Sequence, residues 1–194
     1  MGTRSLKFID DYLMESARVK QLVIKKLDKK IEEVSHLIVS ALKRGNKLLL
    51  CGCGGSAADC QHIAGEFINR FKSERAALPA ISLTTDSSVL TCISNDYSFD
   101  KVFSRQLEAL AKRGDVLIAI TTSGNSRSVI NAAIAAREKG VKVVALTGET
   151  GGAIKGFADY LLNVPSKDTP IIQEAHISIA HIICYIVEKE YFRR

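Results

Sequence analysis

The chain has 194 residues, a formal net charge of +6 at pH 7, and 46% hydrophobic and 25% charged residues. This length suits one domain with a single core, and this composition excludes a disordered or fibrous chain. The basic residues are spread along the chain and mixed with acidic ones, so the positive charge fits an anionic metabolite at least as well as nucleic acid. We expect no nucleic-acid partner.

The N-terminus and the thiols indicate a cytoplasmic protein. Residues 1–10 lack the apolar stretch of a secretory signal, and no apolar run approaches the ~18 residues that cross a bilayer, so we expect no membrane partner. The cysteines are odd in number and mostly lie in or beside apolar segments, which predicts reduced thiols. They are Cys51, Cys53, Cys60, Cys92 and Cys184.

The chain opens with a helical segment. Between Ser5 and Lys43, apolar residues recur largely at helical spacing without proline, which predicts two helices or one broken helix. Gly45 follows as a helix stop signal. The one basic cluster of the segment, interpreted as a solvated face, is Lys25, Lys26, Lys29 and Lys30.

Short apolar runs then alternate mainly with segments of helical periodicity. The predicted strands cover residues 47–51, 80–83, 116–120, 141–146 and 160–164, and a long closing helix is expected from about Ile171 to Tyr191. This alternation implies right-handed crossovers, so we predict an α/β fold with a doubly wound, five-stranded parallel sheet. We expect a single domain over residues 1–194, with a helical segment at 1–44 and the α/β core at 45–194.

The first predicted strand runs into a glycine-rich loop, Gly52-Cys53-Gly54-Gly55-Ser56, which precedes a helix. Glycines allow a ligand to approach the backbone closely, and the amides at a helix N-terminus favour phosphate. The spacing is neither that of a Walker A loop nor that of a dinucleotide fingerprint. A tight turn that binds nothing is the alternative.

A second loop, Thr121-Thr122-Ser123-Gly124-Asn125-Ser126, also joins a strand to a helix. It gathers four hydroxyls, an amide side chain and the first amides of a helix at the edge where open α/β sheets bind ligands. This favours a phosphate cradle. A simple helix cap by Asn125 or Ser126 is the alternative, and capping and binding can coexist.

Polar residues on two helices are candidates for chemistry. His62 and Glu66 lie four apart on one helix face, which suits acid/base groups, two metal ligands or a plain surface pair. The closing helix is strongly apolar, yet it carries Gln173, Glu174, His176 and His181. A satisfied core histidine is the alternative for His181.

Two other sets favour a structural role. His36 in the opening segment is expected to be structural or exposed. The set Cys51, Cys53, Cys60 and His62 has the residue types of a zinc site, but alternation along a strand separates neighbouring thiols, and no second CxxC pair exists.

Together, the two loops, the His62/Glu66 helix and the Gln173/His181 helix resemble the sugar-isomerase (SIS) family, and more narrowly its phosphoheptose isomerases. The similarity runs from about Asp10 to Glu190 and includes Ser94-Asn95-Asp96, Leu146-Thr147-Gly148 and the segment from Pro170 to His176. It implies a flavodoxin-like SIS domain that forms homotetramers with sites between subunits. It also implies an aldose-ketose isomerase that converts sedoheptulose 7-phosphate to glycero-manno-heptose 7-phosphate for bacterial lipopolysaccharide or capsule.

The resemblance further implies roles for individual residues. Glu66 and His181 match the acid/base pair, and the ligands of one divalent ion per subunit, usually zinc, match His62, Glu66, Gln173 and His181. The phosphate contacts match Thr121, Thr122, Ser123 and Ser126, with Ser56 nearby. The sugar contacts match Cys53, Gly54, Gly55, Asn95 and Asp96, and Glu66 and Gln173 are also assigned to the substrate.

Two residues depart from the family pattern. Cys53 stands where members commonly carry Asn, so a side-chain amide contact is missing, and Thr121 replaces a frequent Ser while keeping the hydroxyl. The main rival function is a non-catalytic SIS protein that binds a replication initiator, a group that residues 67–71 and 123–127 also resemble. The His62, Glu66, Gln173 and His181 set favours the enzyme, because a scaffold has no chemical need for it.

Overall fold

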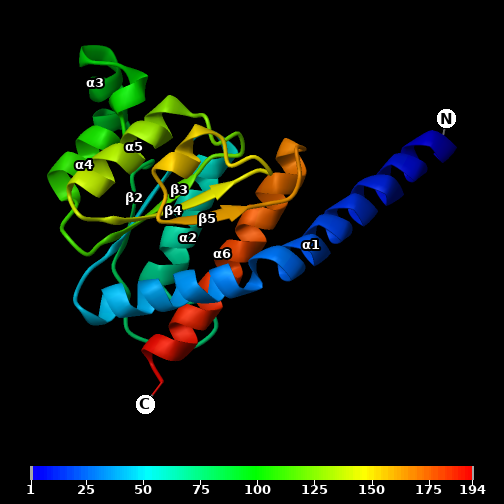
Figure 1. The fold of residues 1–194 in the computed structure, drawn as a ribbon, viewed down its shortest axis with the longest axis horizontal. Helices are drawn as coiled ribbons and strands as arrows, with labels where there is room; N and C mark the ends of the chain where they lie inside the picture. The colour runs from blue at the N-terminus through cyan, green and yellow to red at the C-terminus, as the bar shows by residue number, and fades with distance from the viewer. Residues whose placement is uncertain (1, 194) are drawn as a thin grey trace.

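The computed structural model describes residues 2–193 as a five-stranded sheet with helices on both faces (Figure 1). The strands are β1 (Leu48–Gly52), β2 (Ala80–Ser82), β3 (Val116–Ile120), β4 (Lys142–Thr147) and β5 (Tyr160–Asn163). They lie in the order β2-β1-β3-β4-β5, and every neighbouring pair is parallel. The predicted doubly wound α/β class and all five predicted strands are confirmed.

The helices are divided between the two faces of this sheet. They are α1 (Gly2–Lys43), α2 (Gly55–Ile68), α3 (Ser87–Asp96), α4 (Ser104–Leu110), α5 (Arg127–Glu138) and α6 (Thr169–Tyr191), with short 3-10 helices η1 (Phe99–Lys101) and η2 (Ala153–Gly156). One apolar cluster joins the sheet to α1, α2 and α6, and a second joins it to α3, α4 and α5. Figure 1 shows these two layers on opposite sides of the strands.

The central strands are apolar throughout because both of their faces are covered. In β1, Leu48 and Leu50 belong to the first cluster, whereas Leu49 and Cys51 point into the second. All five residues of β1 and of β3 are buried. Continuous apolar runs of this kind are typical of parallel sheets that lie between two helical layers.

The opening segment is one continuous helix, so the expectation of two helices or a broken helix is wrong. Its C-terminal part buries a stripe against the sheet and α6, which includes Val19, Val23, Leu27, Ile31 and Val34. Further towards the N-terminus the apolar residues are exposed, and this half of α1 projects beyond the α/β body (Figure 1). The helix stays unbroken because the segment holds no interior proline or glycine. The four clustered lysines are exposed, as expected.

The expectation that no segment is long and apolar enough to cross a bilayer is wrong for helix α6. Among the described residues, it alone is long and apolar enough to cross a bilayer by length and composition, with a mean hydropathy of 1.4 over 18 residues. Half of that window is buried within the protein, where Ile179, Ile183 and Val187 pack in the first apolar cluster. These contacts are those of a core helix, and scattered polar residues such as Glu174 and Glu188 hide its length in the sequence.

Candidate functional site

The two predicted loops lie beside each other at the carboxyl edge of the sheet. β1 and β3 are neighbours, and the chain leaves them in opposite directions, through α2 on one face and α5 on the other. The strand order reverses at this point, and open α/β sheets bind ligands in the crevice that such a reversal creates.

The loop after β3 is fixed in place by its neighbours. The Thr121 amide donates to the Leu146 carbonyl at 3.0 Å, and the Gly148 amide donates to the Thr122 carbonyl at 2.8 Å. The Asn125 side chain donates to the Ser123 carbonyl at 3.1 Å and accepts from the Ala153 amide at 2.9 Å. Asn125 therefore shapes the loop, and the hydroxyl of exposed Ser123 accepts a hydrogen bond from the Asn125 amide at 3.1 Å.

Two glycines allow this loop to cross the one after β4. Gly124 and Gly152 have φ angles of 69° and 53°, a region that side chains rarely adopt. A Cβ on Gly124 would lie 2.3 Å from the Gly151 carbonyl oxygen, and one on Gly152 would lie 2.5 Å from the Gly124 carbonyl carbon. Only glycine fits this backbone-to-backbone contact.

The helix cap predicted as an alternative role for Ser126 does not form through its side chain. Ser126 stands at the N-cap of α5 without a capping hydrogen bond from its hydroxyl. Its Oγ lies 3.4 Å from the Ser128 Oγ and 3.7 Å from the Cys53 Sγ. Cys53, at a position where family members commonly carry Asn, thus connects the two loops. Ser56, in the first turn of α2, is buried.

A cavity of about 220 Å³ opens beside the second loop. Thr122 and Ser123 line it from β3, and further polar residues line it from the segments after β4 and β5. The lining residues that sequence analysis missed are Glu149, Thr150, Ser166, Lys167 and Thr169. Their only sequence signal is their position after strands at the same edge of the sheet.

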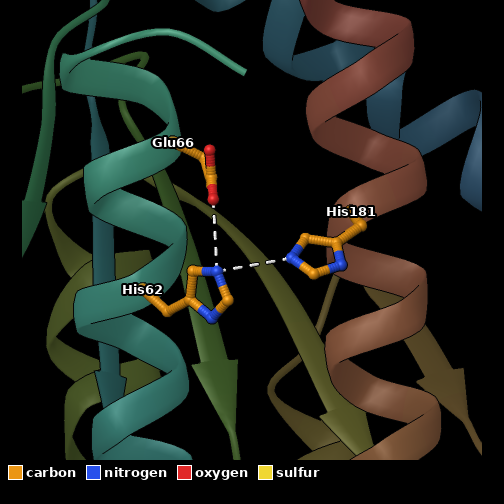
Figure 2. A group of neighbouring side chains, drawn as sticks. All are labelled: His62, Glu66 and His181. Carbon is orange, nitrogen blue, oxygen red and sulfur yellow. Dashed lines mark hydrogen bonds and ion pairs between the residues drawn. The ribbon is translucent and has the colours of Figure 1, made fainter. Parts of the chain in front are cut away.

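His62, Glu66 and His181 come together between α2 and α6, as Figure 2 shows. The His62 Nε2 lies 3.1 Å from the Glu66 Oε1 and 3.5 Å from the His181 Nε2. His62 is exposed, whereas Glu66 and His181 are half-buried. Two helices far apart in the sequence therefore contribute to one acid/base cluster.

Asp59 is a carboxylate near this cluster that sequence analysis missed. One of its oxygens, Oδ2, is buried without a hydrogen-bond partner. Burial raises the pKa of Asp59, and nearby His62 and His181 act in the opposite direction. The signal was present in the sequence, because positions 59, 62 and 66 follow the i, i+3, i+7 pattern of one helix face.

The polar residues of α6 have different roles. Gln173 lies against the glycine loop, where a Cβ on Gly55 would lie 2.6 Å from its Nε2. Glu174 accepts hydrogen bonds from Tyr12 and Ser16 of α1 and so joins two helices. His176 is buried with its Nε2 3.1 Å from the Thr147 carbonyl oxygen, which makes it a structural residue.

Asn95 and Asp96 lie apart from the two loops. They stand at the C-terminal end of α3, where Asn95 donates to the Asp96 carboxylate at 2.9 Å. Both line a cavity with Ser88, Thr91 and Cys92, whereas Thr122 and Ser123 line the cavity described above. Their sugar-binding role stays a prediction.

The donor atoms of the His62, Glu66 and His181 cluster suit a metal ion. All three lie within 4.8 Å of one another. Tetrahedral zinc with bonds of about 2.0–2.1 Å separates its ligand atoms by roughly 3.3 Å. The separations of 3.1 and 3.5 Å from His62 to Glu66 and to His181 bracket that value.

The chain is similar in sequence to characterised families. A family described as the SIS domain matches residues 11–148. The phosphoheptose isomerase of Sulfurimonas denitrificans is 50% identical over 188 residues, which cover 96% of each chain. That of Citrifermentans bemidjiense is 59% identical over 162 residues, which cover 84% of each chain.

Solved structures agree with the sequence relatives. The phosphoheptose isomerase from Neisseria gonorrhoeae superposes with a TM-score of 0.90 at 44% identity, covering 95% of this chain and 98% of its own. The one from Francisella tularensis superposes with a TM-score of 0.93 at 38% identity, with the same two coverages.

Proposed function

This chain belongs to the phosphoheptose isomerase family of SIS-domain proteins, and from that premise we propose how its residues act on sedoheptulose 7-phosphate. The protein is a sugar-phosphate isomerase of heptose biosynthesis, whose product is glycero-manno-heptose 7-phosphate. The rival function, a scaffold for a replication initiator, is not supported, since these relatives are named as isomerases.

The phosphate group is assigned to the crevice between the two loops. Thr121, Thr122, Ser123 and Ser126 are proposed to supply hydroxyls there, and the N-terminus of α5 favours an anion. The hydroxyl of Ser126, which does not cap its own helix, supports this assignment. Cys53, Gly54 and Gly55 are assigned to the sugar, because Cys53 contacts Ser126 and Gly55 lies next to Gln173.

The length of the substrate suits the separation between this crevice and the acid/base cluster. Along α2, the rise of 1.5 Å per residue puts His62 roughly 9 Å and Glu66 roughly 15 Å beyond Ser56. An extended seven-carbon chain with its phosphate spans roughly 10 Å. A phosphate held by the loops therefore brings C1 and C2 to the level of His62, and Glu66 lies about one helical turn further along α2.

Glu66 and His181 are proposed to carry out the proton transfers. Glu66 removes a proton from C1 of the ketose and returns it to C2, while His181 exchanges protons with O1 and O2 through a cis-enediolate. The observation that carries this proposal is the meeting of Glu66 and His181 at His62. One oxygen of Glu66 faces His62, and its second oxygen is left to accept the carbon-bound proton (Figure 2).

A divalent ion, with zinc as our choice, is assigned to His62, Glu66, Gln173 and His181. Bound there, it would polarise the sugar carbonyl as a Lewis acid. The two imidazoles and the carboxylate at ligand spacing support three of these ligands. The fourth, Gln173, is proposed from the family pattern alone. Its side chain lies beside Gly55, about 10 Å along α2 from His62.

We further propose a cytoplasmic homotetramer in which sites form between subunits. The exposed apolar residues of α1 support an association, because monomers rarely expose so many large apolar side chains on one helix. The product would then supply heptose for lipopolysaccharide or capsule. Within each subunit, residues 1–194 would act as one domain, since the buried stripe of α1 shares its core with the sheet.

The deciding experiment follows aldose formation from sedoheptulose 7-phosphate by NMR, with and without a chelator, on the purified protein. We expect isomerisation that the chelator slows and that added zinc restores. A protein that leaves the ketose unchanged at every zinc concentration would refute the proposed function. Turnover at full rate in the chelator would refute the metal assignment alone.

A further inference from the structure

A buried ion pair lies beside the acid/base cluster and is not part of it. Arg75, in the segment after α2, pairs with Glu188 of α6 at 3.1 Å, and the two side chains are only 4% and 6% exposed. The pair joins positions that are 113 residues apart in the sequence. A buried pair is weak evidence for stability, because desolvation offsets much of the attraction.

Glu188 holds the chain that follows α2. Its carboxylate accepts hydrogen bonds from the amides of Phe71, Lys72 and Ser73, each at 2.9 Å, in addition to the Arg75 guanidinium. Burial alone raises the pKa of Glu188, but these donors outweigh it and hold that pKa below its usual range. The carboxylate is therefore charged, and it fixes three consecutive amides.

Arg75 holds the C-terminal end of α2. Its Nη2 donates to the Glu66 carbonyl at 2.6 Å, and its Nη1 donates to the carbonyls of Phe67 at 2.7 Å and Asn69 at 3.2 Å. The last carbonyls of a helix have no partner within the helix, and a cation is favoured there. Arg75 thus supplies hydrogen-bond donors to the carbonyl groups of the helical turn that carries Glu66.

The same segment reaches the second helix through an aromatic ring. The Phe71 ring stacks on the His181 imidazole, with centroids 5.6 Å apart and planes 30° apart. His181 and Glu188 lie seven residues apart on α6, which places them on one face of that helix. Glu188 therefore fixes the backbone of Phe71. The ring of Phe71 lies on the His181 imidazole, two helical turns from Glu188 along α6.

We propose that Arg75 and Glu188 are positioning residues that set the geometry between Glu66 and His181. Phe71 connects Glu188 to the His181 imidazole, because its backbone is held by Glu188 and its ring stacks on the imidazole. Arg75 fixes the turn that bears Glu66, and Glu188 fixes Phe71, which restricts the ring plane of His181. Neither charged group touches the reacting atoms. This inference rests on the proposed function, since it assigns Glu66 and His181 to proton transfer.

The test compares Glu188→Gln and Phe71→Leu with the wild-type protein in turnover of sedoheptulose 7-phosphate. Because misplacement by about 1 Å can lower rates 100-fold, we expect kcat to fall between about 10-fold and 100-fold. KM should stay within about twofold, since the phosphate contacts are untouched. Phe71→Tyr keeps the stacked ring and should retain kcat within about twofold of wild type.

Asp115→Asn is the matched control. Asp115 is also buried, pairs with Lys47 at 2.6 Å and accepts backbone amides from Lys47 and Lys112. This pair ties the amino ends of β1 and β3, opposite the site. We expect Asp115→Asn to lower the free energy of unfolding while the folded enzyme keeps its kcat.

A second measurement reads the position of the ring without turnover. The Cε1 proton of His181, assigned by its loss in His181→Asn, should be shifted upfield by the Phe71 ring in NMR spectra. Phe71→Leu should remove that shift, Glu188→Gln should reduce it, and Asp115→Asn should leave it unchanged. If the wild-type protein does not isomerise the sugar, the proposed function fails while this comparison still decides the positioning.

Three results would overturn the inference. One is a folded Glu188→Gln protein with wild-type kcat. Another is a folded Phe71→Leu protein with wild-type kcat. The third is a His181 resonance that does not move in Glu188→Gln.

Discussion

Two histidine–carboxylate pairs in this protein have the same length and different surroundings. The His62–Glu66 and His36–Glu190 contacts are both 3.1 Å. His36 is half-exposed and its pair joins the surfaces of α1 and α6, whereas the first pair also meets the imidazole of His181. Comparing variants of the two pairs therefore measures the effect of a third side chain, His181, beside a histidine–carboxylate contact.

Glu66→Gln is expected to lower kcat at least ~100-fold, because it removes the base while conserving the size of the side chain. Initial rates of aldose formation measure the effect. Glu190→Gln, the control at the other pair, should keep wild-type turnover. Equal rates for the two variants would contradict the role of Glu66.

His176 is a buried histidine whose folded state favours the neutral form. Burial lowers the pKa of His176 to about 4, and the hydrogen bond with the Thr147 carbonyl only partly opposes this. The unfolded chain has an ordinary value near ~6.5. Because the folded pKa is the lower one, the unfolded state takes up the proton first as the pH falls.

The stabilisation from neutral His176 should therefore be present above about pH 6.5 and lost as the pH falls from there towards 4. Between pH 7 and pH 5 the loss in unfolding free energy should be about 2 kcal/mol. Urea unfolding at the two pH values measures it. His176→Gln cannot titrate, so its loss should be smaller by about that amount; identical losses would exclude His176 as the cause.

At the scale of loops and helices, the loop after β3, to which the phosphate is assigned, depends on a close contact with the backbone of the loop after β4. Gly124 has positive φ and no room for a side chain beside Gly151. Gly45 also has a positive φ, of 80°, but nothing lies within 4 Å of a Cβ built there. The two glycines therefore share the conformational requirement and differ in steric contact.

Gly124→Ala should raise KM for sedoheptulose 7-phosphate at least ~10-fold, because the crossing loops must separate and the hydroxyls of Thr122 and Ser123 move with them. Gly45→Ala should cost about 1 kcal/mol of stability and leave KM unchanged. Steady-state kinetics and urea unfolding together distinguish the two effects. An unchanged KM in Gly124→Ala would count against the phosphate assignment.

The strands and the two loops could be predicted from sequence because their signals are local. Apolar runs that end in glycine or hydroxyl residues identify β1 and β3 with the loops that follow them, and the parallel sheet then requires those loops to share one edge. The continuity of α1 was missed because its apolar face shifts where it leaves the body, a change that looks like a break in the periodicity.

Contacts between residues that are far apart in the sequence could not be predicted from local sequence patterns. Arg75 and Glu188 look like ordinary surface charges in the sequence, and only the packing of α2 against α6 buries them together. His176 appeared to belong with Gln173 and His181, yet helical rotation turns it towards Thr147. Such assignments depend on which helix face is covered, and that is decided by the tertiary fold.

At the scale of the whole molecule, the N-terminal half of α1 projects from the body (Figure 1), and its described residues expose large apolar side chains. Its exposed residues include Leu6, Phe8, Leu13 and Met14, of which Met14 is 72% exposed. Asp10 and Asp11 interrupt this surface with charge. An amphipathic helix of this kind is stabilised when another helix covers its apolar side.

The double variant Leu13→Glu, Met14→Glu should therefore dissociate the proposed tetramer into smaller species, since burying two carboxylates is unfavourable. Light scattering coupled to size-exclusion chromatography measures the mass. Asp11→Lys changes charge on the same turn without removing apolar area and should keep the mass of the wild type. A tetramer that survives the double substitution would place the interface elsewhere.

The packing of α1 against α6 joins the first and the last helix of the chain, which has a consequence for biosynthesis. On the ribosome, Val23, Leu27 and Ile31 emerge early, but the helix that covers them begins only at Thr169. At ordinary translation rates the interval is on the order of 10 s. The nascent chain thus carries an uncovered apolar stripe until α6 emerges, and exposed apolar surface of this kind is prone to aggregate during synthesis.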